Sequence, residues 1–341
     1  MRVLFIGGTG IISTATTRLA LERGIELTLL NRGQHDVEVP AGAKTIRADI
    51  NDRANCKKAL EGQMFDCIVD WVAYTPEHIE RDIDVFSGKT RQYIFISSAS
   101  AYQKPPQHYV ITEKTPLANP HWQYSRDKIA CEERLMRANR EGFPVTIVRP
   151  SLTYGDTQIP LAVNSWEKPW SVVDRMLKGK KVIVPGDGTS LWVITHNSDF
   201  AKGIVGLMGN QKAIGEVFQI TSDEARTWDA YYSVVADALG VKAKIVHIAS
   251  DFIVACAPEQ EGSLTGDKSV SCVFDNLKVK ALVPDFVCTT PFAAGIRSSL
   301  AWFKADAKRQ VVDQEFDAMC DKLIDVYERG LRQAVQEFSA K

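Results

Sequence analysis

Tyr124 and Lys128 carry the first chemical signal in this sequence of 341 residues. In a helix, side chains four residues apart share one face. An ammonium beside a phenol favours the tyrosinate form, which lowers the pKa of the tyrosine toward the range useful for acid–base catalysis. The same spacing also occurs on solvated helix faces, so its meaning depends on the rest of the chain.

Two serines stand upstream, at the end of an apolar run predicted to be a strand at Gln92–Ser97. Ser97 is the last residue of that run, and Ser98 follows it. A hydroxyl at a strand end can hold a substrate oxygen while a proton moves. The residues alone leave open which serine does so.

A glycine-rich turn follows the first apolar run and reads Gly7-Gly8-Thr9-Gly10-Ile11-Ile12-Ser13. Glycine lets a backbone turn tightly and approach a pyrophosphate, and the free N–H groups of the next helix favour phosphate. A plain strand-to-helix turn is the alternative. Its place directly after the N-terminal strand favours a dinucleotide site that includes Gly7, Gly10, Ile11 and Ile12.

The second predicted strand ends in Asn31 and Arg32 rather than in a carboxylate. A carboxylate there usually binds the ribose hydroxyls of NAD, whereas an arginine can pair with a 2′-phosphate. The cofactor is therefore predicted to be NAD(P), with a preference for NADP, unless Arg32 only faces solvent.

Two further strand ends are expected to line the cofactor. Asp49 and Ile50 stand where an adenine would lie, and Val72 and Ala73 would form the opposite edge. Ordinary packing at strand ends would explain these residues equally well.

These residues need a parallel sheet to bring them together. Short apolar runs alternate with amphipathic stretches, which predicts an α/β fold, a Rossmann-type doubly wound parallel sheet. The predicted strands are Arg2–Ile6, Glu26–Leu30, Ala43–Arg47, Cys67–Val72, Gln92–Ser97 and Val145–Arg149. The predicted helices are Ile12–Glu22, Arg53–Leu60, Glu77–Phe86 and Tyr124–Asn139. Within the last helix, the charged run Glu132-Glu133-Arg134 is typical of a solvated face.

The texture changes after Pro150, where loops and turn clusters become frequent. We expect a smaller mixed C-terminal substrate domain that ends in a helix around Gln314–Gln333. The predicted division gives residues 1–157, with a return segment near 190–222, to the NAD(P)-binding domain. It gives 158–189 and 223–341 to the substrate-binding domain.

Composition narrows the choice of partners. The formal net charge is −1, which argues against nucleic acid and anionic membranes. No apolar run is long enough to cross a bilayer. The seven cysteines show no CxxC spacing, which predicts a reducing compartment and hence the cytoplasm. The histidines show no HxH or HExxH spacing, so no metal site is expected.

Taken with these motifs, the sequence resembles the extended short-chain dehydrogenase/reductase family, the NAD-dependent epimerase/dehydratase group. The resemblance also includes Arg149-Pro150-Ser151-Leu152-Thr153-Tyr154-Gly155 and Pro185-Gly186-Asp187-Gly188. It implies Tyr124 as the acid/base, Lys128 as its activator and a ribose ligand, and Ser98 rather than Ser97 as the substrate-binding serine.

The resemblance implies hydride transfer on a hydroxyl or carbonyl substrate, with a nucleotide sugar as the expected partner. Ala99 and Ser100 follow Ser98 where the family's 4,6-dehydratases have an Asp-Glu pair, which favours an epimerase or reductase. The alternative is a non-catalytic dinucleotide- or RNA-binding member of the same fold family. By analogy with the family, a homodimer is expected.

Overall fold

The structure of the protein is a computed structural model that describes residues 1–33 and 39–340. The chain forms two compact units. The first contains Met1–Thr153, Ile194–Asp223 and Phe274–Thr290, and the second contains Tyr154–Val193, Glu224–Val273 and Pro291–Lys341. The sequence-based division kept 223–341 in one piece, whereas Phe274–Thr290 belongs to the first unit because Val279 and Val283 pack into its core.

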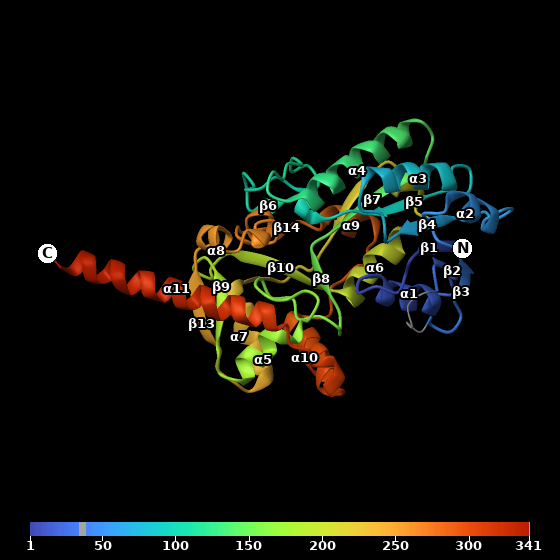
Figure 1. The fold of residues 1–341 in the computed structure, drawn as a ribbon. Coiled ribbons are helices and arrows are strands. Elements are labelled where there is room, and N and C mark those ends of the chain that lie inside the picture. Colours follow the sequence, from blue (N-terminus) through green and yellow to red (C-terminus); the bar gives the residue numbers. More distant parts are fainter. Residues whose placement is uncertain (34–38, 341) are drawn as a thin grey trace. The chain divides into compact units, whose positions relative to one another are not determined.

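A seven-stranded sheet runs through the first unit, with the order β11-β7-β5-β4-β1-β2-β3, and its neighbouring strands are parallel (Figure 1). The strands are β1 (Arg2–Ile6), β2 (Glu26–Asn31), β3 (Lys44–Arg47), β4 (Cys67–Asp70), β5 (Tyr93–Ile96), β7 (Val145–Pro150) and β11 (Val217–Ile220). The predicted doubly wound parallel sheet is confirmed.

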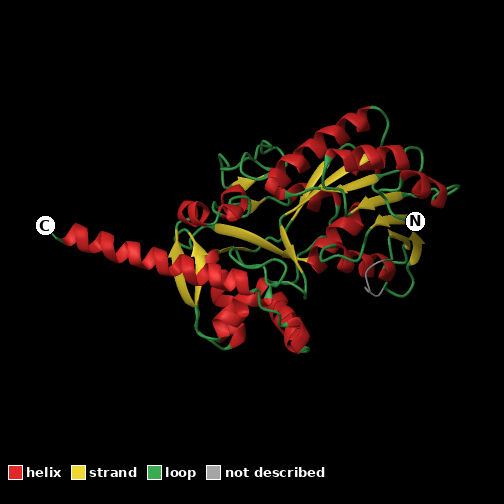
Figure 2. Cartoon of the chain, viewed as in Figure 1, coloured by secondary structure: helices red, strands yellow, loops and turns green. Residues whose placement is uncertain are grey.

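Helices cover both faces of this sheet (Figure 2). One face carries α1 (Ser13–Glu22), α6 (Asn197–Leu207) and α9 (Leu277–Leu282); the other carries α2 (Arg53–Ala59), α3 (Pro76–Phe86) and α4 (Gln123–Arg140). Alternate strand residues divide between the two cores, as Phe5 and Val69 do against Leu4 and Ile68. Burial on both faces explains the continuous apolar runs.

Two strands end earlier than their apolar runs suggest, and both ends lie at the carboxyl edge of the sheet. β4 ends at Asp70 because the carboxylate of this residue accepts hydrogen bonds from the N–H groups of Val72 and Ala73 and so turns the chain. β5 ends at Ile96, and Ser98 then caps a short 3-10 turn at Ala99–Ala101.

The second unit is a mixed assembly of short strands and helices, as predicted. In it β9 pairs in parallel with β13, and residues Leu191–Val193 pair antiparallel with β12. Its elements are α5 (Trp170–Leu177), β9 (Lys181–Pro185), β12 (Ala225–Thr227), α7 (Trp228–Leu239), β13 (Lys244–Ile248), α8 (Ser250–Cys256), α10 (Phe292–Lys304) and α11 (Gln314–Ser339). The other short strands in the described residues are β6 (Val110–Ile111), β8 (Leu152–Tyr154), β10 (Leu191–His196) and β14 (Val273–Phe274).

Helix α11 continues beyond the predicted end at Gln333 to Ser339. Its first half packs into the core of the second unit through Phe316, Leu323 and Ile324. Among the residues that the structure describes, no helix is both long enough and apolar enough to span a bilayer.

Candidate active site

Lys128 lies on α4 with its ammonium buried at the carboxyl edge of the sheet. The Nζ atom donates hydrogen bonds to the carbonyl oxygens of Ala73, at 2.7 Å, and Ile96, at 2.8 Å. It also lies 4.6 Å from the ring centroid of Tyr74 and 4.7 Å from that of Phe95. Burial disfavours the charged form and lowers the pKa of Lys128 to about 8.

Tyr124 lies one helical turn before Lys128, on the same side of α4. The Lys128 Nζ is 5.8 Å from the centroid of the Tyr124 ring. The ring is flanked by Trp122, with centroids 5.0 Å apart, and by Tyr74, with centroids 6.4 Å apart. The structure therefore brings the predicted phenol and ammonium together beside the turn that follows β4.

Ser97 and Ser98 have different surroundings. Ser97 is buried, and its hydroxyl donates to a Glu132 carboxylate oxygen at 2.5 Å. Ser98 is half-buried, and its hydroxyl oxygen lies 2.9 Å from that of Ser100, which in turn accepts from Ser125 at 2.7 Å. The chain of hydroxyls thus joins Ser98 to the residue next to Tyr124, a link that no motif in the sequence signals.

A buried ion pair fixes α4 to the sheet one turn beyond Lys128. The Arg149 guanidinium on β7 donates to both carboxylate oxygens of Glu132, at 2.9 and 2.5 Å. The prediction of a solvated face for Glu132-Glu133-Arg134 is therefore wrong at Glu132, which is 3 % exposed. The sequence carried a signal that was missed, because Arg149 stands in an apolar strand and needs a buried partner there.

The glycine turn has a backbone that few other residues can adopt. Gly7 and Gly8 have φ values of 91° and 107°. A Cβ on Gly8 would lie 2.9 Å from Leu29, and a Cβ on Gly7 would lie 3.0 Å from Val72. The two glycines therefore let the turn pack tightly against Leu29 of β2 and against Val72, and a tight turn of this kind fits the close approach of a pyrophosphate.

Ser13, which replaces the third glycine of the motif, stabilises the turn through a hydrogen bond inside it. Its hydroxyl accepts a hydrogen bond from the N–H of Gly10 at 2.8 Å. Of the two isoleucines between them, Ile11 is exposed and Ile12 is half-buried at the start of α1. Gly10 itself has no need of a positive φ.

Two arginines, one of them from the neighbouring strand β3, lie at the carboxyl end of β2, where the sequence predicted only one. Arg32 is exposed and follows half-buried Asn31. The Arg47 Nε on β3 lies 3.3 Å from the point where a Cβ on Gly33 would stand. The backbone carbonyl of Asn31 also accepts a hydrogen bond from the N–H of Ala48 at 3.2 Å, which holds the two strand ends together. The pairing of β2 with β3 is what brings Arg47 here, and the sequence alone did not reveal it.

Asp49 and Ile50 follow β3 at the same edge. The Asp49 carboxylate accepts the N–H of Asn51 at 2.9 Å, and Ile50 is buried. Val72 and Ala73 lie between the glycine turn and the lysine, because Val72 faces Gly7 and the Ala73 carbonyl binds Lys128. Gly7, Val72, Ala73 and Lys128 thus form one continuous row.

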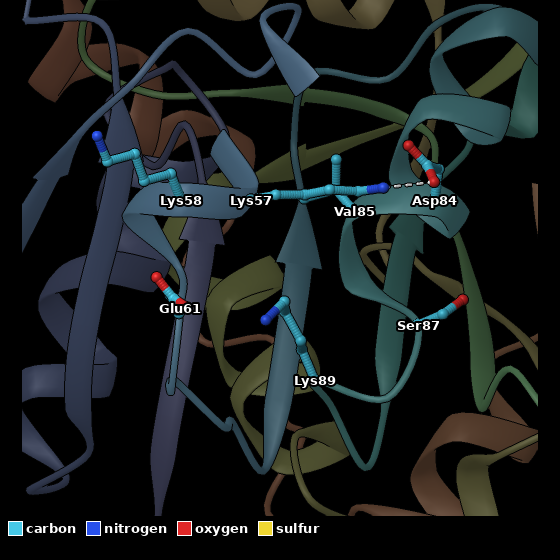
Figure 3. Close-up of a pocket in the computed structure, with 7 residues that line it drawn as sticks. All are labelled: Lys57, Lys58, Glu61, Asp84, Val85, Ser87 and Lys89. Carbon is cyan, nitrogen blue, oxygen red and sulfur yellow. Dashed lines mark hydrogen bonds and ion pairs between the residues drawn. The ribbon is translucent and has the colours of Figure 1, made fainter. Parts of the chain in front are cut away.

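A separate hollow of about 360 Å³ lies at the opposite, amino edge of the sheet, between the ends of α2 and α3 (Figure 3). Its rim carries three lysines and two carboxylates, of which Lys57 and Asp84 form an ion pair of 2.6 Å. None of the predicted site residues lies there. Across residues 1–33 and 39–340, no cluster of three or more His, Cys, Asp or Glu side chains is placed to hold a metal ion.

Comparison with known proteins gives one family and several distant relatives. The model of the NAD dependent epimerase/dehydratase family matches residues 3–221. The chain is 26% identical over 260 residues to the chloroplast stem-loop binding protein of 41 kDa b of Arabidopsis thaliana, covering 72% of the chain and 65% of that relative. It is 23% identical over 244 residues to 2'-dehydrokanamycin reductase of Streptomyces kanamyceticus, covering 70% and 67%. The chain thus spans about two thirds of the length of these relatives.

Solved structures share the fold at low sequence identity. The UDP-glucuronic acid 4-epimerase of Bacillus cereus in complex with NAD superposes with a TM-score of 0.69 and 18% identity. The match covers 89% of this chain and 99% of that one.

Proposed function

Because the chain belongs to the NAD dependent epimerase/dehydratase family, we propose that it is a cytoplasmic NAD(P)-dependent oxidoreductase acting on a hydroxyl or carbonyl group, with a nucleotide-activated sugar as substrate. The observation that carries the proposal is the burial of the Lys128 ammonium next to Tyr124, between the carbonyls of Ala73 and Ile96. Burying a cation is costly unless hydrogen bonds or an opposite charge offset its desolvation, and ionisable groups buried in this way are common at functional sites.

Within this proposal the dinucleotide supplies or accepts the hydride when it is bound. Tyr124 gives its phenolic proton to the substrate oxygen in reduction and takes it back in oxidation. Lys128 stabilises the resulting tyrosinate by its charge. Two of its three N–H groups bind carbonyls, which leaves the third for a ribose hydroxyl. Ser98 donates to the substrate oxygen, and Ser100 orients the Ser98 hydroxyl.

The reaction is proposed to be an epimerisation or a reduction rather than a 4,6-dehydration. Dehydration needs an acid and a base beyond Tyr124, and the residues after Ser98 are Ala99 and Ser100. Two carboxylates near the predicted site are occupied: Asp70 accepts from backbone N–H groups, and Asp127 accepts from Gln123 at 2.7 Å.

Incubation with a panel of uridine, thymidine and guanosine diphosphate sugars, with either oxidised or reduced cofactor, tests the proposal. NMR of the products should show an inverted hydroxyl or net consumption of reduced cofactor, and Tyr124→Phe protein should give neither. A 4-keto-6-deoxy sugar would overturn the choice of reaction. The absence of turnover with every sugar and both cofactors would overturn the substrate class.

NADP is proposed as the preferred cofactor because Arg32 and Arg47 both flank the end of β2, and the described residues 31–33 at this end include no carboxylate. Arg32→Ala should weaken NADP binding by about 1.5–3 kcal/mol, the scale of a charge-assisted hydrogen bond, and leave NAD binding unchanged. Calorimetric titration of both cofactors measures this, with Arg23→Ala, an exposed arginine at the end of α1, as the matched control. Equal affinity of the wild type for NAD and NADP would refute the preference.

The likeness to a protein named for stem-loop binding supports one alternative, an RNA-binding role. The balanced charge of the chain argues against it. Titration of the protein with a labelled stem-loop RNA separates the two functions. Binding that survives Tyr124→Phe, together with no turnover of any sugar, would favour the alternative.

A further inference from the structure

Two buried carboxyl groups lie directly behind the row of residues that holds Lys128. Asp70, at the end of β4, and Asp82, on α3, are both fully buried. The hydroxyl oxygen of Tyr93 lies between them, 2.8 Å from Asp70 Oδ2 and 2.9 Å from Asp82 Oδ2. The Arg81 Nε donates to the other oxygen of Asp82 at 2.8 Å.

Proton counting decides the charge of this cluster. The Tyr93 phenol carries one proton and can donate it to only one of its two carboxyl neighbours. If Asp82 is protonated, it donates to Tyr93 and Tyr93 donates to Asp70, so both short contacts become hydrogen bonds. If both carboxyl groups were ionised, one of the two short contacts of the Tyr93 hydroxyl would hold no proton and would set two oxygen lone pairs against each other.

The surroundings favour this arrangement. Burial and the neighbouring Asp70 carboxylate raise the pKa of Asp82 well above its ordinary value, against the opposing effect of Arg81. Burial and the two carboxyl groups likewise raise the pKa of Tyr93, which keeps the phenol neutral. The titratable groups that face the cluster from the packed elements are Cys56 on α2, His78 and Arg81 on α3, Lys128 and Cys131 on α4, and Tyr74 after the turn.

Asp70 connects this cluster to the predicted lysine in two ways. Its Oδ1 accepts the N–H groups of Val72, at 2.7 Å, and Ala73, at 3.0 Å. The Ala73 carbonyl then accepts from Lys128. The negative charge of Asp70 also raises the pKa of Lys128, against the larger lowering by burial.

We propose that Asp70 is a positioning residue for Lys128: its carboxylate fixes the turn at 71–73 and supports the lysine ammonium, while Asp82 keeps a proton that it shares with Tyr93. The inference rests on the proposed role of Lys128 in turnover, but its physical content is independent of any substrate. The proton remains within the cluster, and no bond other than hydrogen bonds is made or broken.

NMR titration of the full chain, with lysines labelled with carbon-13 at Cε, tests the proposal. Lys128→Arg protein assigns the resonance. In Asp70→Asn protein the amide oxygen can still accept from Val72 and Ala73, so the turn survives while the charge is lost. The apparent pKa of Lys128 should then fall by about one unit. In Asp82→Asn protein the amide donates to Tyr93 as the protonated acid does, and the Lys128 titration should stay in place.

An unchanged Lys128 titration in Asp70→Asn, or an equal shift in both variants, would overturn the proposal. Should Asp70→Asn fail to fold, carbon-13 NMR of aspartate carboxyl groups decides instead. The wild type should keep one protonated aspartate at neutral pH, and this signal should be missing in Asp82→Asn; a wild type without it refutes the shared proton. Neither measurement uses turnover, so a wrong proposal for the enzyme's reaction would leave both results intact.

Discussion

The two edges of the parallel sheet use charged residues in opposite ways. At the carboxyl edge Lys128, Glu132 and Arg149 are each less than 5 % exposed, and each is bound by specific partners. At the amino edge the Lys57 and Asp84 side chains, on the rim of the hollow in Figure 3, are 45 % and 43 % exposed. Water solvates those charges whether or not they meet.

This difference indicates at which edge of the sheet in the first unit a functional site should be sought. The charges around the hollow are open to water, so they cost little free energy and restrict the local geometry little. A charge taken out of water must be paired, hydrogen-bonded or neutralised, so the buried groups indicate a site with a fixed geometry. The following predictions test whether the two edges differ in this way.

Tyr124→Phe should have the largest effect. Removing only the phenolic oxygen should lower kcat by about 10²–10⁴-fold, the usual scale for general acid–base catalysis. Because half-buried Tyr124 keeps its ring contacts with Trp122 and Tyr74, the fold and cofactor affinity should be preserved. Steady-state kinetics with the substrate found in the sugar panel measure the rate, with Tyr109→Phe, an exposed tyrosine, as the control. Wild-type turnover in Tyr124→Phe would remove the tyrosine from the mechanism.

Glu132→Ala should have the largest effect on stability. The Arg149 guanidinium would stay buried without its carboxylate, and breaking such a pair typically costs about 3–5 kcal/mol. Urea unfolding followed by circular dichroism measures the free energy. The neighbouring Glu133 is exposed, so Glu133→Ala should change it by less than about 0.5 kcal/mol. Similar losses for the two variants would mean that burial does not distinguish them.

Lys128→Met should change how stability depends on pH. The folded pKa of Lys128 is about 8, below the ordinary value of 10.5. Between these values the unfolded chain holds a proton that the folded chain lacks, so this residue makes the wild type more stable as pH rises, by about 3 kcal/mol at most. The free energy of unfolding of the wild type, relative to that of Lys128→Met, should therefore increase from pH 8 to pH 10.

Urea unfolding at several pH values within that range measures the gap. Lys89→Met, at the hollow on the opposite edge, is the matched control and should run parallel to the wild type. If the difference in free energy of unfolding between the wild type and Lys128→Met did not change with pH, burial would not be lowering the pKa of Lys128.

Sequence patterns predicted the sheet and its helices well because burial on two faces leaves a clear signature. The strand at Arg2–Ile6 has its predicted bounds, and the helix at Arg53–Leu60 ends one residue early. Local spacing also sufficed to put Tyr124 and Lys128 on one face of a helix. The family resemblance is confirmed by the match over residues 3–221.

What sequence could not predict depends on contacts between distant segments. Arg47 reaches the end of β2 through strand pairing, and Glu132 meets Arg149 across the helix–sheet interface. The cluster of Asp70, Tyr93 and Asp82 joins two strands and a helix. Apart from Arg149, which begins one of the segments that carry the family resemblance, none of these residues lies in a motif. An isolated charged residue in an apolar segment indicates that a partner exists but does not identify it.

The smallest effect is expected at the amino edge, for Lys57→Ala. The Lys57 ammonium forms a hydrogen bond with the Asp84 carboxylate and lowers its pKa. A carboxyl group whose pKa is lower in the folded state contributes its full stabilisation above the pKa of the unfolded state. This stabilisation is lost as the pH falls through the pKa of the folded state. Both side chains are largely solvated. We therefore expect no resolvable change in the urea midpoint of Lys57→Ala at neutral or acid pH, and a kcat equal to that of the wild type.

A double-mutant cycle with Asp84→Ala, at low and high salt, isolates the contribution of the Lys57–Asp84 pair from other effects of each substitution. A coupling at low salt as large as the loss in Glu132→Ala would show that exposure does not weaken charges in this unit, and the contrast between the two edges would fail.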